Sequence, residues 1–241
     1  MANEPNSGYV KNVTAFKNLL EACTSHGDTY NPAREALQLN NLNALYQSVT
    51  DTLAECTSRE IAYDNLVDAR IMTFKDLKPL ATKVIGTLNS SGVSSQIKEA
   101  ARTINHKVQG SRPAAKVSPD GEASESRRVS SSKQGFDEKI SEFAKLIELV
   151  KSQPEYKPNE PALQVVGLQG YFSSLSAAQD AVGKANVSWH NSRVQRDKLM
   201  YAPDTGLVDI ALAVKEYLKG IFGASSPEFK LAKGFAFKTL V

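Results

Sequence analysis

The chain has 241 residues, of which 41% are hydrophobic, 23% charged and 7% aromatic, and its formal net charge is +3. These proportions are typical of a globular protein, and they exclude disordered and fibrous classes. No stretch reaches roughly 18 uninterrupted apolar residues, and the first residues lack a basic start followed by an apolar core. We therefore expect a cytoplasmic protein without a membrane span.

The positive charge is concentrated in one segment. Between Lys107 and Lys133 there are six basic and three acidic residues, which leaves 23 of each sign in the rest of the chain. Nucleic-acid affinity depends mainly on clustered Lys and Arg. The neutral remainder predicts no nucleic-acid binding by the folded body, so any such binding would run through this segment.

The first half of the chain predicts a helical bundle over residues 9–106. A short amphipathic helix comes first and is followed by a turn at Tyr30, a long helix, and two shorter helices that end near Gly92 and Ile104. Along the long helix, apolar residues recur every seven positions, and an arginine follows at the same spacing. This series is Leu42, Val49, Cys56, Tyr63 and Arg70. This spacing predicts a buried helical stripe.

Residues 107–135 are rich in Ser, Gly, Pro and charge, with almost nothing to bury. Such a composition predicts a flexible linker between two folded parts. A second bundle is predicted over residues 136–241, with Asp204 or Thr205 as the N-cap of its third helix, Gly223 as the end of that helix, and Ser226 as the next N-cap.

The two bundles match each other in sequence. "YNPAREALQL" begins at Tyr30 and "YKPNEPALQV" begins at Tyr156, 126 residues later. At the same offset the second long helix carries the stripe Leu168, Leu175, Val182, Trp189 and Arg196. Upstream, at an offset of 127, Phe16 matches Phe143. We predict an all-α, tandem duplicated fold of antiparallel helical bundles, with three to four helices and one long helix per copy, arranged as a pseudo-two-fold dimer on one chain.

The segments "YKPNEPAL" and "RDKLMYAPDTGLVDIALAVKEYLKGIFGASSPEFK" resemble those of a family of uncharacterised helical proteins of Bacteroidota. Those proteins often carry the same two-copy arrangement, and the likeness covers most of the second copy and is looser in the first. The resemblance implies the architecture and supplies no catalytic residue.

Motifs for catalysis, metals or cofactors are absent from the sequence. The three histidines are scattered, the two cysteines align with Val150 and Val182 and so resemble buried hydrophobes, and no phosphate-binding glycine loop or nucleophile motif occurs. "GLQG" at Gly167 lies inside the long helix, where it suggests close approach of another helix. We expect no enzyme activity, no cofactor and no metal site.

One polar pair recurs in both copies and supplies the candidate site residues. Asn65 and Arg70 in the first copy match Asn191 and Arg196 in the second. An arginine at the end of an apolar stripe can bury its stem and bond the groups that close a helix. The other interpretation is a contact with an anion or a protein partner on each copy.

The sequence favours a non-enzymatic module for protein interaction or self-assembly, which presents helical faces to protein partners or to further copies of itself. The alternative is a small-molecule or lipid binder that uses the bundle interior. The oligomeric state stays open at this stage.

Overall fold

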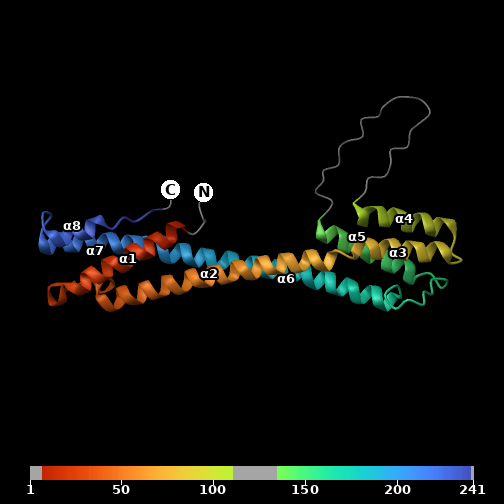
Figure 1. Ribbon diagram of the computed structural model, residues 1–241, viewed down its shortest axis with the longest axis horizontal. Coiled ribbons are helices and arrows are strands. Elements are labelled where there is room, and N and C mark those ends of the chain that lie inside the picture. Colours follow the sequence, from red (N-terminus) through yellow and green to blue (C-terminus); the bar gives the residue numbers. More distant parts are fainter. Residues whose placement is uncertain (1–6, 111–134, 240–241) are drawn as a thin grey trace, which may run out of the picture. The chain divides into compact units, whose positions relative to one another are not determined.

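The computed structural model describes residues 7–110 and 135–239 (Figure 1). Within them the chain is all-helical and contains no strand, which confirms the predicted class. The first half holds α1 (Ser7–Ser25), α2 (Leu39–Phe74), α3 (Leu77–Ser90) and α4 (Ser95–Gln109). The second half holds α5 (Phe136–Lys151), α6 (Val165–Tyr201), α7 (Leu207–Phe222) and α8 (Pro227–Gly234). Two short 3-10 turns, Gly27–Thr29 and Glu35–Leu37, lie between α1 and α2.

The predicted linker falls largely outside the described residues, which omit 111–134. Its first three residues are not part of a linker, because α4 continues to Gln109 and ends at Gly110 in the left-handed conformation, with φ 71°. Glycine adopts this conformation without steric cost, so it ends the helix.

The compact units of the chain do not coincide with the predicted ranges 9–106 and 136–241. Unit 1 consists of residues 1–62 and 186–241, and unit 2 consists of residues 63–185. Both boundaries fall inside long helices, so α2 and α6 each contribute to both units. Each unit therefore combines helices from the two halves of the sequence.

Unit 1 has a core drawn from both halves. Phe16, Leu19 and Cys23 of α1 are buried in one cluster with Met200 of α6 and with the apolar face of α7. The members contributed by α7 are Leu207, Val208, Ile210, Ala211, Val214 and Leu218. The first helix of the chain is thus covered by the last helices, which the sequence repeat could not indicate.

Unit 2 is built in the corresponding way. Leu77, Val84 and Leu88 of α3 share a buried cluster with Phe143 and Leu146 of α5. The start of α6 closes the same core with Leu168 and Leu175, both fully buried. Burial of this kind contributes about 1.5–3 kcal/mol for each large aliphatic or aromatic side chain, so the cores dominate the stability of both units.

Three helix ends carry the signals read from the sequence, whereas α4 runs past its predicted end near Ile104 and α7 has a different N-cap. Ser94 caps α4 and Ser226 caps α8, each accepting a hydrogen bond from the backbone N–H three residues later. Gly223 ends α7 as predicted. The N-cap of α7 is Gly206 and not Asp204 or Thr205. A Cβ on residue 206 would lie 2.6 Å from the Ala202 nitrogen, so this tight turn accepts only glycine.

The glycine in "GLQG" does allow a close approach, but not by another helix as predicted. A Cβ on Gly167 would lie 2.2 Å from the carbonyl oxygen of Pro161, in the turn that leads into α6. At the matched position in the first half, Asn41 donates from Nδ2 to the carbonyl oxygen of Glu35 at 2.7 Å. Both halves therefore fold the turn back onto the start of the long helix.

The two matched tyrosines make the same bond in both halves. Tyr30 donates from its hydroxyl to the carbonyl oxygen of Leu37 at 2.7 Å, and Tyr156 donates to that of Leu163 at 2.9 Å. Both rings are buried. Each tyrosine fixes the turn that precedes a long helix, and burial raises the pKa of the Tyr156 hydroxyl to about 12.

Replacing either tyrosine by phenylalanine tests this role. We expect Tyr30→Phe and Tyr156→Phe each to lower the free energy of unfolding by about 1 kcal/mol, because each leaves a buried carbonyl without its donor. Urea unfolding followed by circular dichroism measures the change. Tyr46→Phe is the matched control, because Tyr46 is a half-buried tyrosine on α2. An equal loss of unfolding free energy in that variant would contradict the assignment.

Candidate functional site

The two repeated arginines lie at equivalent places, one in each unit. Arg196, on α6, is 7% exposed, and its guanidinium carbon lies 3.8 Å from the centre of the Tyr9 ring on α1. Arg70, on α2, is half-buried, and its guanidinium carbon lies 4.0 Å from the centre of the Phe136 ring on α5. Each arginine therefore stacks on an aromatic ring from the other half of the sequence. We call these contacts the arginine clasps.

The aromatic partners also match between the halves. Tyr9 and Phe136 are 127 residues apart, which is the offset that relates the first helices. A cation above a ring face contributes on the order of 0.5–2 kcal/mol, more where water is excluded. The clasps thus join the end of each long helix to the start of the opposite first helix, and this gives a structural reason for the repeated arginine.

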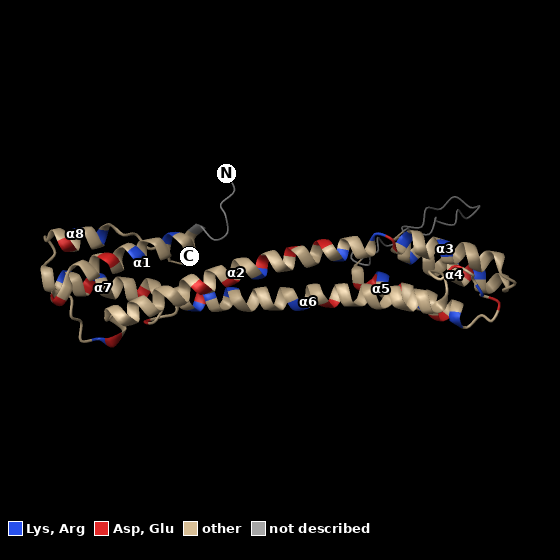
Figure 2. Ribbon diagram, turned by 60° about the horizontal axis from the view of Figure 1, so that its bottom comes forward, with Lys and Arg blue, Asp and Glu red and all other residues tan. Residues whose placement is uncertain are grey.

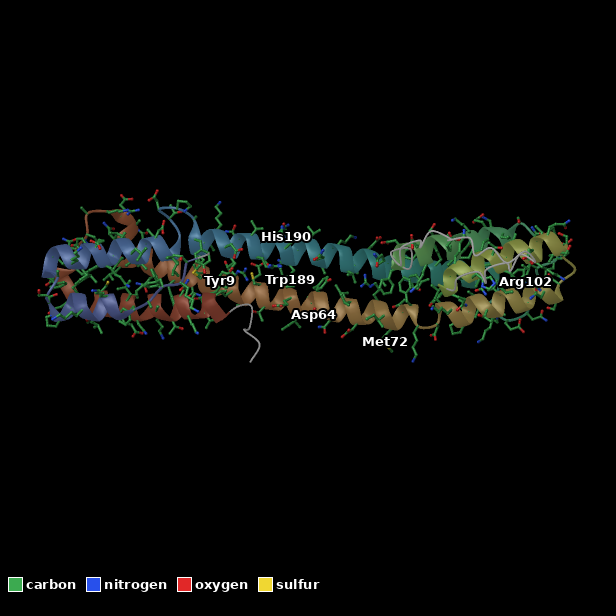
Figure 3. All side chains as sticks on the ribbon, turned by 90° about the horizontal axis from the view of Figure 1, so that it is seen from above. Tyr9, Asp64, Met72, Arg102, Trp189 and His190 are labelled. Carbon is green, nitrogen blue, oxygen red and sulfur yellow. The ribbon has the colours of Figure 1, made fainter. Side chains whose placement is uncertain are left out.

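The polar surroundings of the two clasps differ. In unit 1, Arg196 donates from Nε and Nη2 to Oδ1 of Asp197 at 2.9 and 2.8 Å, and from Nη2 to the Tyr9 hydroxyl at 3.0 Å. Tyr9 donates its own proton to the same Asp197 oxygen at 2.8 Å. Figure 3 labels Tyr9 in this region. These bonds to charged groups make the clasp of unit 1 the stronger one.

Unit 2 has a neutral partner in place of the aspartate. Arg70 donates from Nη1 to Oε1 of Gln179 at 2.9 Å, and Gln179 in turn donates to Asp137 at 3.1 Å. The Nε of Arg70 is buried and has no acceptor among the described residues. A buried donor without an acceptor costs free energy, so this clasp contributes less.

The asparagines that accompany the arginines are not brought into the clasps. Asn65 and Asn191 are both exposed on their helices. The structure thus separates the four candidate residues into two arginines that pack inside the units and two asparagines on the surface. His190 is also exposed on α6 (Figure 3).

Burial and the aspartate together change the acidity of Tyr9. Desolvation, followed by the hydrogen bond to Asp197, raises the pKa of Tyr9 from its ordinary value of 10.0 to about 12. Burial also raises the pKa of the neighbouring Tyr201, against whose ring Tyr9 packs edge-on with centroids 5.7 Å apart. Both phenols therefore stay neutral hydrogen-bonding groups at physiological pH.

Asn12, one turn after Tyr9 on α1, is a further polar residue that the sequence did not single out. It is fully buried. Its Nδ2 donates to the carbonyl oxygen of Lys238 at 2.8 Å and to the hydroxyl of Tyr201 at 3.4 Å, while its Oδ1 accepts from the Lys238 backbone nitrogen at 2.7 Å. No motif marks Asn12, because its partner lies 226 residues away.

The cysteines and the charged residues offer no built site. Cys23 and Cys56 are free and buried, as their alignment with valines predicted, and burial raises the pKa of the Cys23 thiol to about 11. In the part of the chain that the structure describes, no three His, Cys, Asp or Glu side chains are grouped to hold a metal ion. Figure 2 shows acidic and basic residues mixed along the helices.

A pocket of about 400 Å³ lies in unit 1, between the turn before α2 and the turn before α7. Arg34 lines this pocket and donates from Nη2 to the carbonyl oxygen of Asp204 at 3.0 Å. Arg34, Glu35, Asn41, Asp204 and Thr205 in its lining are exposed, whereas Ile210 forms its buried floor. This pocket opens on the surface and is lined by both polar and apolar side chains, including Ala36 and Leu45.

No protein-family model matches the chain, and neither a curated protein nor a solved structure matches it. Among the described helices, none is both long and apolar enough to cross a membrane. The interpretation of the site thus rests on its own geometry.

The clasps predict unequal effects of truncating the four candidate residues. We expect Arg196→Ala to lower the free energy of unfolding by about 2–3 kcal/mol, since it removes charged hydrogen bonds and a buried ring contact, and Arg70→Ala to lower it by about 1 kcal/mol. Asn65→Ala and Asn191→Ala, the exposed controls, should change it by less than about 0.5 kcal/mol. Urea unfolding of the four variants measures this order, and equal effects at the arginines and asparagines would contradict it.

The raised tyrosine pKa values predict alkaline destabilisation. Tyr9, Tyr156 and Tyr171 each have a pKa raised from 10.0 to about 12. Above pH 10 the unfolded chain loses phenolic protons that the folded chain keeps, so stability is complete below that pH and falls as the pH rises to about 12. Urea unfolding at several pH values tests this, with Tyr9→Phe expected to show a shallower fall. A stability independent of pH across this window would refute the assignment.

Proposed function

We propose that the protein is a non-enzymatic interaction module that assembles with further copies of itself in the cytoplasm. The observation that carries this proposal is a pair of exposed apolar side chains at matched positions of the two halves. Ile61 on α2 and Val187 on α6 are 126 residues apart in sequence and are 56% and 59% exposed. Two matched apolar residues kept on the surface are suited to contact with a partner.

The two side chains belong to one face of unit 1. The hydrogen bond from Nη1 of Arg59 to the Ser188 hydroxyl joins α2 to α6 beside them. Ile61 comes five residues after buried Cys56, and Val194, 54% exposed, comes five residues after Trp189. When two antiparallel helices pack through their buried stripes, residues that follow a stripe position by the same number of residues lie on the same side of the helix pair. Ile61, Val187 and Val194 are called here the apolar face.

The charges around the apolar face are self-complementary. From residue 39 to 62, α2 carries Asp51, Glu55 and Glu60 against Arg59. From residue 186 to 201, α6 carries the exposed Arg193 and Lys198, whereas Arg196 and Asp197 are paired with each other in the clasp of unit 1. A second copy, related to the first by a two-fold axis parallel to these helices, would place its acidic α2 against the basic α6 of the first copy. Such a two-fold contact repeats the same favourable pairing on both sides.

The same proposal includes a relationship between the two halves. We infer a duplicated, approximately two-fold arrangement, in which the two halves descend from one unit in the manner of the two-copy helical proteins of Bacteroidota. The matched tyrosine bonds and the matched arginine clasps support it. In this view the chain is a fused pair, and its apolar face lies where the matched long helices run past each other.

The mass of the full chain in solution tests the self-assembly. We expect light scattering after size exclusion to give a mass that rises with concentration from 26.2 kDa toward its double. Replacing Ile61 and Val187 by serine should hold the mass at 26.2 kDa with little change in stability, since both side chains are largely exposed.

Leu231→Ser on α8 is the matched control, because Leu231 is 55% exposed and lies outside the apolar face. It should associate as the wild type does. A wild type that stays at the single-chain mass at every concentration would overturn self-assembly, and a serine variant that still associates would show that another surface is responsible.

A further inference from the structure

The segment after α8 is held on unit 1 as an extended segment. Residues 235–239 are neither helix nor strand, and Asn12 of α1 hydrogen-bonds to them at Lys238. Both bonds go to the backbone N–H and C=O of that residue, at 2.7 and 2.8 Å. A side-chain amide that pairs with one residue's backbone in this way recognises an extended chain whatever its side chain is.

A second anchor comes from α7. Lys215 donates from Nζ to the carbonyl oxygen of Phe235, and its ammonium nitrogen lies 4.9 Å from the centre of the Phe237 ring. Phe235 and Phe237 are half-buried and pack on the core of unit 1, whereas Ala236, Lys238 and Thr239 are exposed. Side chains two apart on an extended chain point to the same side, so the segment presents both Phe235 and Phe237 to the protein.

Unit 2 has no equivalent of this arrangement in its described residues. The residue that matches Asn12, at an offset of 127, is Lys139, and its ammonium lies 5.5 Å from the centre of the Phe136 ring. The helix at the end of the first half, α4, has 15 residues, whereas α8 at the end of the second half has 8. The fully buried Asn12 is satisfied by the backbone of the extended segment and by the Tyr201 hydroxyl, whereas its counterpart in unit 2 is a lysine.

The hold on this segment is limited to a few groups. One backbone pair, one lysine and two half-buried rings fix it, and three of its five residues are exposed. Segments with few buried contacts open more readily than the cores they cover. When the segment dissociates, Asn12 and Lys215 become available to hydrogen-bond the backbone of another extended chain. The two sites that Phe235 and Phe237 occupied lie beside them.

We propose that this face of α1 and α7, called here the tail-binding face, binds an extended segment of another protein that carries aromatic residues two positions apart, in competition with residues 235–239. The ligand is defined by the segment now in place: aromatic, any residue, aromatic, followed by a residue whose backbone pairs with Asn12. This site is separate from the apolar face and does not depend on self-assembly.

A peptide-binding experiment on the full chain tests the proposal. The probe is a fluorescently labelled peptide with the sequence GFAFKTLV, and the receptor is the full chain with Phe235→Ala and Phe237→Ala, whose own segment has lost its ring anchors. We expect fluorescence anisotropy to show saturable binding to this variant and binding at least about ten-fold weaker to the wild type. A peptide with both phenylalanines replaced by alanine should not bind.

Two further substitutions in this variant assign the contact. Adding Asn12→Ala should weaken peptide binding about ten-fold, because it removes both backbone bonds. Adding Thr14→Ala, an exposed position on the same helix, is the matched control and should leave the affinity unchanged. Adding Ile61→Ser and Val187→Ser should also leave it unchanged, which separates this site from the proposed assembly face.

Lys238→Pro is a second receptor variant with a smaller change. It keeps both phenylalanine rings and removes the backbone N–H that donates to Oδ1 of Asn12. It should also bind the peptide more tightly than the wild type does. Failure of the peptide to bind any folded variant, or binding that is indifferent to Asn12, overturns the proposal. An associated wild type that becomes a single chain when both phenylalanines are replaced would show instead that copies exchange this segment, and would overturn the assignment to another protein.

Discussion

The burial of the apolar stripes on α2 and α6 is the constraint on which the rest of the structure depends. These helices have 36 and 37 residues, far longer than the helices of 8 to 19 residues around them. One half of the chain cannot cover its own long helix from end to end. The start of α2 therefore contributes Leu42 and Val49 to a core completed by α7, and its end contributes Phe74 to a core completed by α5. The stability of each unit is a property of both halves together.

The arginine clasps are a consequence of that exchange. The apolar stripe of each long helix reaches an arginine, whose aliphatic stem can be buried and whose guanidinium needs a partner. Arg70 and Arg196 find this partner on the first helix of the opposite half. The ring excludes water while the guanidinium keeps hydrogen bonds to Gln179 or Asp197. The most noticeable polar feature of the repeat is thus used inside the protein, which leaves recognition to other surfaces.

Two surfaces of unit 1 have features that the folded cores do not require. On one, Ile61, Val187 and Val194 stay exposed although polar residues there would cost the fold little. On the other, a buried asparagine takes both of its backbone hydrogen bonds from a segment that few contacts hold. The first surface suits a helical partner with complementary charge, and the second suits an extended chain.

The sequence by itself determined the helices, most of their ends and the buried stripes, because these follow from local periodicity, capping residues and glycine. It also identified Arg70 and Arg196 as repeated, although not what they contact. Only the tertiary structure decided that residues 1–62 and 186–241 form one unit and residues 63–185 the other. A repeat shows which segments are alike, but which copy of a segment covers which stripe depends on contacts between residues far apart in the chain. For the same reason the partners of Tyr9, Asn12 and Lys215 lay beyond sequence reasoning: each is set by the packing of distant segments, which leaves no local pattern to read.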